Sequence, residues 1–273
     1  MARPPDHPTV HVGKIWRLIL ADLGLSRLAV LRRAGLPGGL LDGDGARISL
    51  DDFYALWVSF EIEAQSPTLP LRLGQVEASE YFDPAFFAAI CAPDMTVAGQ
   101  RLGEFKRLVG AFSLDVDVQP DATRFTYRCK YRPDLPVVIA ATELVFLVNL
   151  ARRATRHRVV PRAVCLPGPV QDKPAFEDWF GCPVDEGESA FFTLDPMEAQ
   201  RPFLTQDNRM WQSFEPGLRR RMEEARDALS TRARIENALL ELLPSGRAQI
   251  DDVARELAVS RRSLQRRLSE EGT

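Results

Sequence analysis

The longest apolar stretch of the chain constrains the fold more than any other feature. It reads PVVIAATELVFLVNLA, residues 136–151, and its apolar side chains fall on nearly every side of a helix. A helix that is apolar all round is stable only when it is buried. We therefore expect a helix over 136–151 that packs against a sheet. Glu143, the carboxylate within this stretch, is expected to form a buried ion pair or hydrogen bond, with one of the arginines as the candidate partner, rather than to act in catalysis.

The segments before this helix alternate between apolar and polar residues, as half-buried strands do. SLDVDVQP at 113–120 and TRFTYRCKY at 123–131 are separated by Asp121 and Ala122. This pattern predicts a β-hairpin. The apolar helix is expected to pack against it.

The other elements of the first 205 residues are expected to be short. Helical spacing predicts two pieces within 14–34, a helix capped by Ser49, and helices at 67–77, 84–91, 95–110 and 174–180. Short strands are expected around 162–166 and 189–194. The sequence therefore predicts an α+β domain over 1–205.

The charge balance limits the partners of the chain. The net charge is −3, so any attraction to a polyanion has to come from a local patch. Arg17, Asp22 and Arg27 interrupt the apolar residues near the N-terminus, which argues against a signal peptide and against a membrane span. We expect a cytoplasmic protein with no membrane partner.

The sequence lacks the patterns that catalysis or metal binding requires. It has no GxSxG motif, no Gly-rich phosphate loop and no Cys/His pair at motif distance. The four cysteines are widely spaced with no CxxC pair: Cys91, Cys129, Cys165 and Cys182. The sequence has only three histidines that could join a metal site: His7, His11 and His157. We expect no enzyme activity, no metal site and no bound cofactor.

A charged helix begins near Asp207. Residues 206–229 are expected to form a linker helix, with Met210, Trp211, Phe214, Leu218 and Met222 along one side and a kink at Pro216. Such a helix is typical of a linker or a dimer-forming arm. A helix folded onto its own domain is the alternative.

The last segment, 230–273, has the pattern of a helix-turn-helix. IDDVAREL follows the break at Pro244–Gly246, Ala258 and Val259 form a turn, and Ser260 can cap a third helix. Leu264 and Leu268 point inward at i, i+4 spacing. We expect an all-α domain after the α+β domain.

The third helix of this segment is strongly basic. From Ser260 to Leu268 there are four arginines and no acid. The side chains expected to contact DNA in a major groove are Ser260, Arg261, Arg262, Ser263, Gln265 and Arg266. The alternative is an ordinary three-helix unit with a solvated basic face.

These residues carry a family resemblance. VARELAVSRRSLQRRLSEEGT resembles the first helix-turn-helix of AraC/XylS-type transcriptional regulators, although Ala258 stands where the family usually has Gly. Upstream segments resemble the arabinose-binding-like regulatory domain of that family: LRRAGLP, LRLGQ, PRAV, FGCPVDEGE and RMWQSFEPGLRRRMEEARDAL. The resemblance implies a dimeric regulator that binds promoter DNA and an effector, with RNA polymerase as a further candidate partner.

The resemblance also implies a second helix-turn-helix. AraC-type DNA-binding regions carry two such units, whereas this sequence stops at Thr273, just after the first. We therefore expect 230–273 to be a truncated DNA-binding region. One unit makes few phosphate contacts, so its binding to DNA at physiological salt is expected to be weak.

A basic cluster follows the apolar helix. RRATRHR, residues 152–158, contains Arg152, Arg153, Arg156 and Arg158, and Arg156 stands where Gly is usual in the family. The RxxxR spacing resembles the arginine motif with which PilZ domains bind cyclic di-GMP, and the AraC family includes a cyclic-di-GMP-sensing activator. The second PilZ motif is absent.

The chemistry of the cluster suits this ligand. Arginines four apart on a helix share a face, and guanidinium groups can bind phosphates or guanine edges. We therefore expect cyclic di-GMP as the effector. Two alternatives stay open: the cations only stabilise a helix C-terminus, or a sugar, amino acid or apolar metabolite binds in a pocket of the N-terminal domain.

Overall fold

The computed structural model describes residues 9–13, 15–43, 45–76, 84–109, 111–227, 231–243, 246–247 and 249–270. The chain divides into two compact units, one spanning Thr9–Leu218 and the other running from Arg219 onward. The division falls within a long helix, so the boundaries expected at 205 and 229 remain a prediction. Each unit is described by itself.

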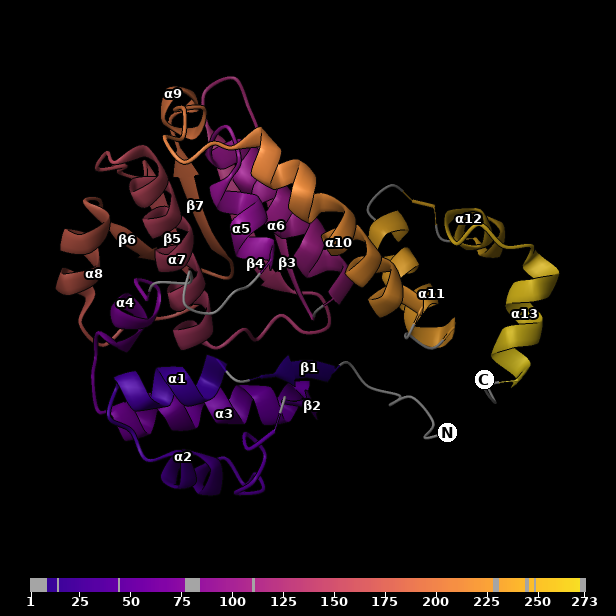
Figure 1. The fold of residues 1–273 in the computed structure, drawn as a ribbon, viewed down its shortest axis with the longest axis horizontal. Helices are drawn as coiled ribbons and strands as arrows, with labels where there is room; N and C mark the ends of the chain where they lie inside the picture. The colour runs from indigo at the N-terminus through magenta and orange to yellow at the C-terminus, as the bar shows by residue number, and fades with distance from the viewer. Residues whose placement is uncertain are drawn as a thin grey trace. The chain divides into compact units, whose positions relative to one another are not determined.

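The first unit starts with a two-stranded sheet and three helices (Figure 1). The elements are β1 (Thr9–Val12), α1 (Ile15–Asp22), α2 (Arg27–Arg33), β2 (Ala46–Ser49) and α3 (Leu50–Ala64). The break between α1 and α2 confirms the prediction, and Gly24 there has a φ of 67°. Ser49 caps α3 as predicted, since its Oγ accepts the N–H of Asp52 at 3.1 Å. The antiparallel pair of β1 and β2 was not predicted.

Three helices follow, and one of them approaches the large sheet closely. They are α4 (Leu69–Leu73), α5 (Pro84–Ile90) and α6 (Met95–Val109). In α6, Gly99 and Gly103 face the sheet, and a Cβ at Gly103 would lie 2.3 Å from the carbonyl oxygen of Leu114. The helix backbone therefore packs directly on a strand. Part of the 67–77 segment lies beyond α4, and residue 77 lies outside the described residues.

The large sheet has the order β3-β4-β7-β5-β6. The strands are β3 (Phe112–Val118), β4 (Thr123–Cys129), β5 (Ala163–Leu166), β6 (Val184–Glu186) and β7 (Ala190–Leu194). Val118 pairs with Thr123 in the antiparallel β3–β4 hairpin, which confirms that prediction. β5 and β6 are parallel and joined through α8 (Lys173–Phe180). β6 was not predicted, because three residues are too few to show an alternating pattern.

The apolar stretch forms α7 (Val137–Thr155), which contacts β4, β5 and β7 (Figure 1). Leu144, Val145, Leu147 and Val148 are fully buried within it. The predicted buried helix is therefore confirmed, and it extends four residues beyond 151. On the sheet, the stacked rings of Phe125 and Phe192 have centroids 4.7 Å apart.

The chain then passes through α9 (Pro196–Ala199) into α10 (Asn208–Asp227), which continues through Pro216. The half of α10 before Leu218 belongs to the first unit and packs against it. Phe214 of α10 stacks on Phe87 of α5, with ring centroids 5.7 Å apart. The predicted position of Met222 lies outside the described side chains. Among the described helices, none is both long and apolar enough to span a membrane.

The second unit contains α11 (Thr231–Leu242), α12 (Ile250–Glu256) and α13 (Arg261–Glu270). Its small apolar core consists of Ala238, Leu242, Val253, Ala254, Leu257 and Leu264. The two short helices and their turn follow the predicted pattern. The chain thus combines an α+β unit with a smaller unit that is helical throughout its described residues.

Candidate functional site

The turn between α12 and α13 is set by two local features. Ala258 adopts a left-handed conformation with a φ of 52°, and the N–H of Val259 donates to the carbonyl of Ala254 at 2.9 Å. Ser260 then caps α13, since its Oγ accepts the N–H of Ser263 at 3.1 Å. The turn orients α13 so that Leu264 is buried. The opposite side of its first turns is left to solvent.

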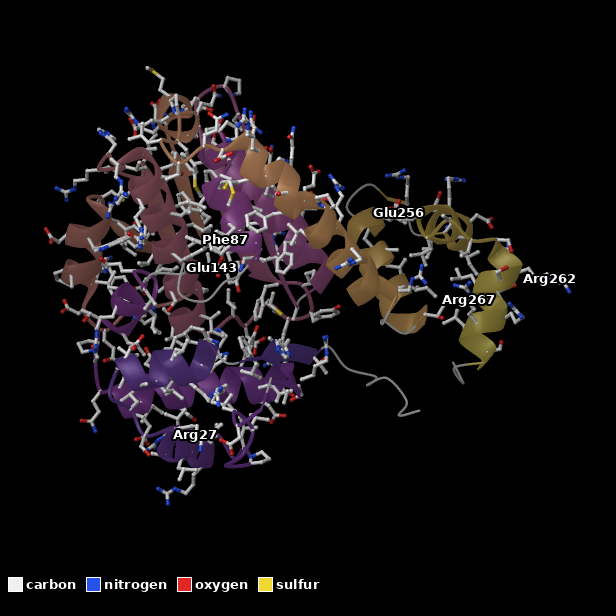
Figure 2. All side chains as sticks on the ribbon, in the orientation of Figure 1. Arg27, Phe87, Glu143, Glu256, Arg262 and Arg267 are labelled. Atoms are coloured by element: carbon white, nitrogen blue, oxygen red, sulfur yellow. The ribbon has the colours of Figure 1, made fainter. Side chains whose placement is uncertain are left out.

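The structure places the predicted DNA-contacting side chains together at the N-terminal end of α13. Five of these side chains are exposed: Ser260, Arg261, Arg262, Gln265 and Arg266. The sixth, Ser263, is half-buried. Arg262 projects away from α11 (Figure 2). Arg261 also lies near an acid, because its Nη1 is 3.8 Å from Asp251 Oδ2 of α12. This end of α13 has the donors that base edges and phosphates require.

The arginines of the basic cluster, at the C-terminal end of α7, differ in their surroundings more than the sequence indicates. Arg152 Nε donates to the carbonyl of Val159 at 2.9 Å, and its Nη2 donates to the carbonyl of Phe180 at 3.0 Å. The guanidinium carbon lies 4.3 Å from the ring centroid of Trp179. Burial lowers the pKa of this arginine, and the nearby Arg158 lowers it further.

Arg152 and Arg158 both donate hydrogen bonds to carbonyls at the C-terminus of α8. Arg158 Nη2 donates to the carbonyl of Asp178 at 3.3 Å. The last carbonyls of a helix lack intrahelical partners and carry partial negative charge. Arg152 and Arg158 donate hydrogen bonds to these carbonyls of α8. The sequence did not predict this structural role for the two arginines. No sequence pattern linked Trp179 and Phe180 to the arginines, because only the tertiary fold brings α8 to the end of α7.

The predicted common face of Arg152 and Arg156 is corrected by the structure. α7 ends at Thr155, and Arg156 is its cap in the left-handed region with a φ of 54°. The i, i+4 relation holds only within a continuous helix. Arg156 is exposed, and it has no carboxylate partner within the described part of the chain. Arg153 is half-buried and lines a small cavity with Phe86.

A larger cavity lies where β4 ends and β7 begins. Its volume is ≈ 410 Å³, within the range of small-molecule sites, and its lining includes Arg128, Lys130, Tyr131, Arg132, Glu188 and Ser189. Arg132 is held by ion pairs with Asp51 and Asp134. The hydrogen bond from Arg132 lowers the pKa of Asp134. No sequence motif indicated this cavity, because its walls come from separate strands and loops.

Glu143 forms an ion pair as expected, but its partner is a lysine and not one of the arginines. Its Oε1 lies 2.9 Å from Nζ of Lys106 on α6. The ring of Tyr127 lies beside this pair, with its centroid 5.3 Å from the lysine nitrogen. Burial raises the pKa of Tyr127, and the charge of Glu143 adds to the rise. The pair therefore joins α6 to α7 beneath the sheet.

Comparison with known proteins gives consistent matches. Residues 24–203 match the family described as the arabinose-binding domain of AraC transcription regulators, N-terminal. The HTH-type transcriptional regulator VirS of Mycobacterium tuberculosis, in strains CDC 1551 and H37Rv, is 25% identical over 265 residues, covering 93% of this chain and 76% of VirS. The crystal structure of the transcriptional regulator CdpR from Pseudomonas aeruginosa matches with a TM-score of 0.54 and 22% identity, over 97% of this chain and 81% of that one. The match to CdpR shows a shared fold.

Proposed function

The chain belongs to the AraC transcription regulators with an N-terminal arabinose-binding domain, and on that premise we propose that it binds promoter DNA through the N-terminal end of α13. The observation that carries the proposal is the set of exposed donors on this end, with Arg262 directed outward (Figure 2). Arginine can bind guanine bidentately in the major groove, and hydroxyl and amide groups can bind phosphates or adenine.

The test compares two arginines on the same helix. A preferred duplex is first selected from a random library at low salt, and its affinity is measured by fluorescence anisotropy. Arg262→Ala is expected to weaken binding by about 1–3 kcal/mol and to relax the preference at one base position. Arg267→Ala removes the same charge from the last turn of α13 and is the matched control. Equal losses in the two variants would reject base reading by Arg262.

The proposed effector of the first unit is cyclic di-GMP, bound at the basic cluster. Support comes from Arg156, which holds a left-handed conformation where the family usually has Gly. A β-carbon in that region costs roughly 1–2 kcal/mol, so an arginine at this position carries a conformational penalty that glycine would not. Arg156 and its neighbour Arg158 can pair with phosphate oxygens, while Arg152 holds the segment after α7 in place.

The effector test uses a substitution at Arg156 that is expected to increase the stability of the protein and to decrease its affinity for the ligand. Arg156→Gly removes the guanidinium and also relieves the strained backbone. It is expected to raise the midpoint of thermal unfolding and to weaken cyclic di-GMP binding, measured by calorimetry, at least about tenfold. Arg32→Ala, which removes an exposed arginine on α2 away from both candidate sites, is the control and should bind as the unchanged protein does. Unaltered affinity in Arg156→Gly would reject the site.

A second candidate effector is a small metabolite in the cavity at the end of β4. The cavity volume of ≈ 410 Å³ favours this alternative, since a sugar or an amino acid fits within it. A metabolite screen by thermal shift would identify such a ligand. Ser189→Phe, which fills the cavity, is expected to abolish the shift, whereas Arg156→Gly should leave it unchanged.

A further inference from the structure

One segment of the first unit contacts both the basic cluster and the base of α10. We call residues 195–207 the strap. The N–H of Leu204 in the strap donates to the carbonyl of Ala154 at 2.8 Å. Ala154 lies in the last turn of α7, two residues before Arg156. The strap is therefore attached to the element that ends in the basic cluster.

The strap also brings a carboxylate to the cluster. Glu198 Oε2 lies 3.8 Å from Nε2 of His157, a distance at which a protonated imidazole forms an ion pair. Within the strap, Arg201 binds the same carboxylate through two nitrogens, with Nε 3.2 Å from Oε2. Glu198 thus occupies a position beside the cluster that an anionic ligand would also favour.

Near its C-terminal end the strap is hydrogen-bonded to the last residue of α5 and to the turn before α6. The hydroxyl of Thr205 donates to the carbonyl of Ile90 at 2.6 Å, and the N–H of Phe203 donates to the carbonyl of Pro93 at 2.8 Å. α10 starts directly afterwards. Its Trp211 ring lies under the guanidinium of Arg101 on α6, with 3.8 Å between the guanidinium carbon and the ring centroid.

We propose that the strap couples anion binding at the basic cluster to the seating of α10 on α5 and α6. A phosphate bound by Arg156 competes with Glu198 for His157, and the displaced carboxylate loosens the strap. The bonds of Leu204 and Thr205 lie in the same short segment, so the start of α10 shifts with it. Ligand and strap then favour different arrangements of α10, as a population shift requires. This inference rests on the proposed effector function.

Two tryptophans allow the coupling to be measured separately from binding. Trp179 lies against Arg152 at the cluster, and Trp211 lies against Arg101 at the base of α10. The full chain, which has four tryptophans, is labelled with 5-fluorotryptophan. Among the ¹⁹F resonances, those of Trp179 and Trp211 are assigned with Trp179→Phe and Trp211→Phe. Cyclic di-GMP is expected to shift both resonances at the same ligand concentration.

The outcomes separate the two proposals. A shift at Trp179 without one at Trp211 overturns the coupling and leaves the effector site standing. The absence of calorimetric binding and of both shifts overturns the effector proposal, and the coupling with it. A shift at Trp211 that follows binding supports the strap as the connection.

Substitutions in the strap give a second measurement. Glu198→Gln removes the competing charge, so it should strengthen cyclic di-GMP binding severalfold and move the ligand-free Trp211 resonance toward its ligand-bound position. Glu186→Gln on β6 removes the same charge outside the strap and should resemble the unchanged protein. Leu204→Pro removes the N–H that binds Ala154 and should retain binding while losing the Trp211 shift. If Glu198→Gln and Glu186→Gln behave alike, the coupling through Glu198 is wrong.

Discussion

Backbone conformation at individual residues links local chemistry to the proposed functions. Arg156 and Ala258 have φ values of 54° and 52°, in a region that favours glycine. At Arg156 the penalty accompanies an exposed guanidinium that the proposed effector would use. At Ala258 the side chain is a methyl group with no such role, so its penalty follows only from the tight turn before α13. The same backbone feature thus has different consequences at the two positions.

Ala258→Gly is expected to stabilise the second unit by about 0.5–1 kcal/mol, because glycine adopts a left-handed conformation without the β-carbon penalty. Thermal and urea unfolding of the full chain, followed by helical circular dichroism, would measure the change. DNA affinity should not fall, since the turn keeps its geometry. A less stable variant would contradict the strained turn.

Arg152→Lys tests whether the planar guanidinium group, with its several donors, contributes more to stability than the positive charge does. Lysine retains the charge but cannot reach the carbonyls of Val159 and Phe180 together while also stacking on Trp179. A loss of about 1–2 kcal/mol in unfolding free energy is expected, since the carbonyls of Val159 and Phe180 compete for a single donor group. Arg32→Lys, at an exposed position in α2, should change stability little. Equal effects would show that Arg152 has no special structural role.

At the scale of elements, close approach of backbones determines the arrangement around the sheet. Gly99 and Gly103 are one turn apart on α6, and both lack the side chain that would hold the helix away from β3 and β4. Gly74 approaches Val145 of α7 in a similar way, with only 2.6 Å between a β-carbon added there and the side chain. These contacts fix the position of α6, which carries Arg101, and of α7, which ends in the basic cluster.

Gly103→Ala is expected to destabilise the first unit by about 1–3 kcal/mol, because the new methyl group would overlap the carbonyl of Leu114. Gly217→Ala in α10 is the matched control, since a β-carbon there meets no atom within 4 Å. The control should be neutral or stabilising by up to about 1 kcal/mol. Urea unfolding of both variants would separate steric overlap from helix propensity.

For the whole molecule, the net charge of −3 and the basic end of α13 have opposite effects on DNA. Binding therefore depends on local phosphate contacts, and screening by salt should weaken it steeply. The slope of log affinity against log salt is expected to be about −0.9 for each phosphate contacted. Anisotropy titrations across a salt series would measure it. Affinity that does not change with salt would contradict binding through these arginines.

The sequence by itself determined the elements whose signal is local. Side-chain periodicity predicted the buried helix α7 and the β3–β4 hairpin, and the cap at Ser260 and the turn at Ala258 predicted the start of α13. These features depend on residues close together in the chain, so their physics can be evaluated without the fold. The outward placement of Arg262 follows from the same helical spacing.

Only the tertiary structure decided where long-range partners meet. The strands β1, β2 and β6 have three or four residues, and pairing across the sheets stabilises them. The arginines at the C-terminal end of α7 looked equivalent in the sequence. In the structure, carbonyls of α8 bind Arg152 and Arg158, whereas Arg156 caps α7 and its side chain is exposed. The large cavity and the strap likewise depend on segments far apart in the chain. A guanidinium can bind a carbonyl, a ring or a phosphate, and the fold determines which of these lies within reach.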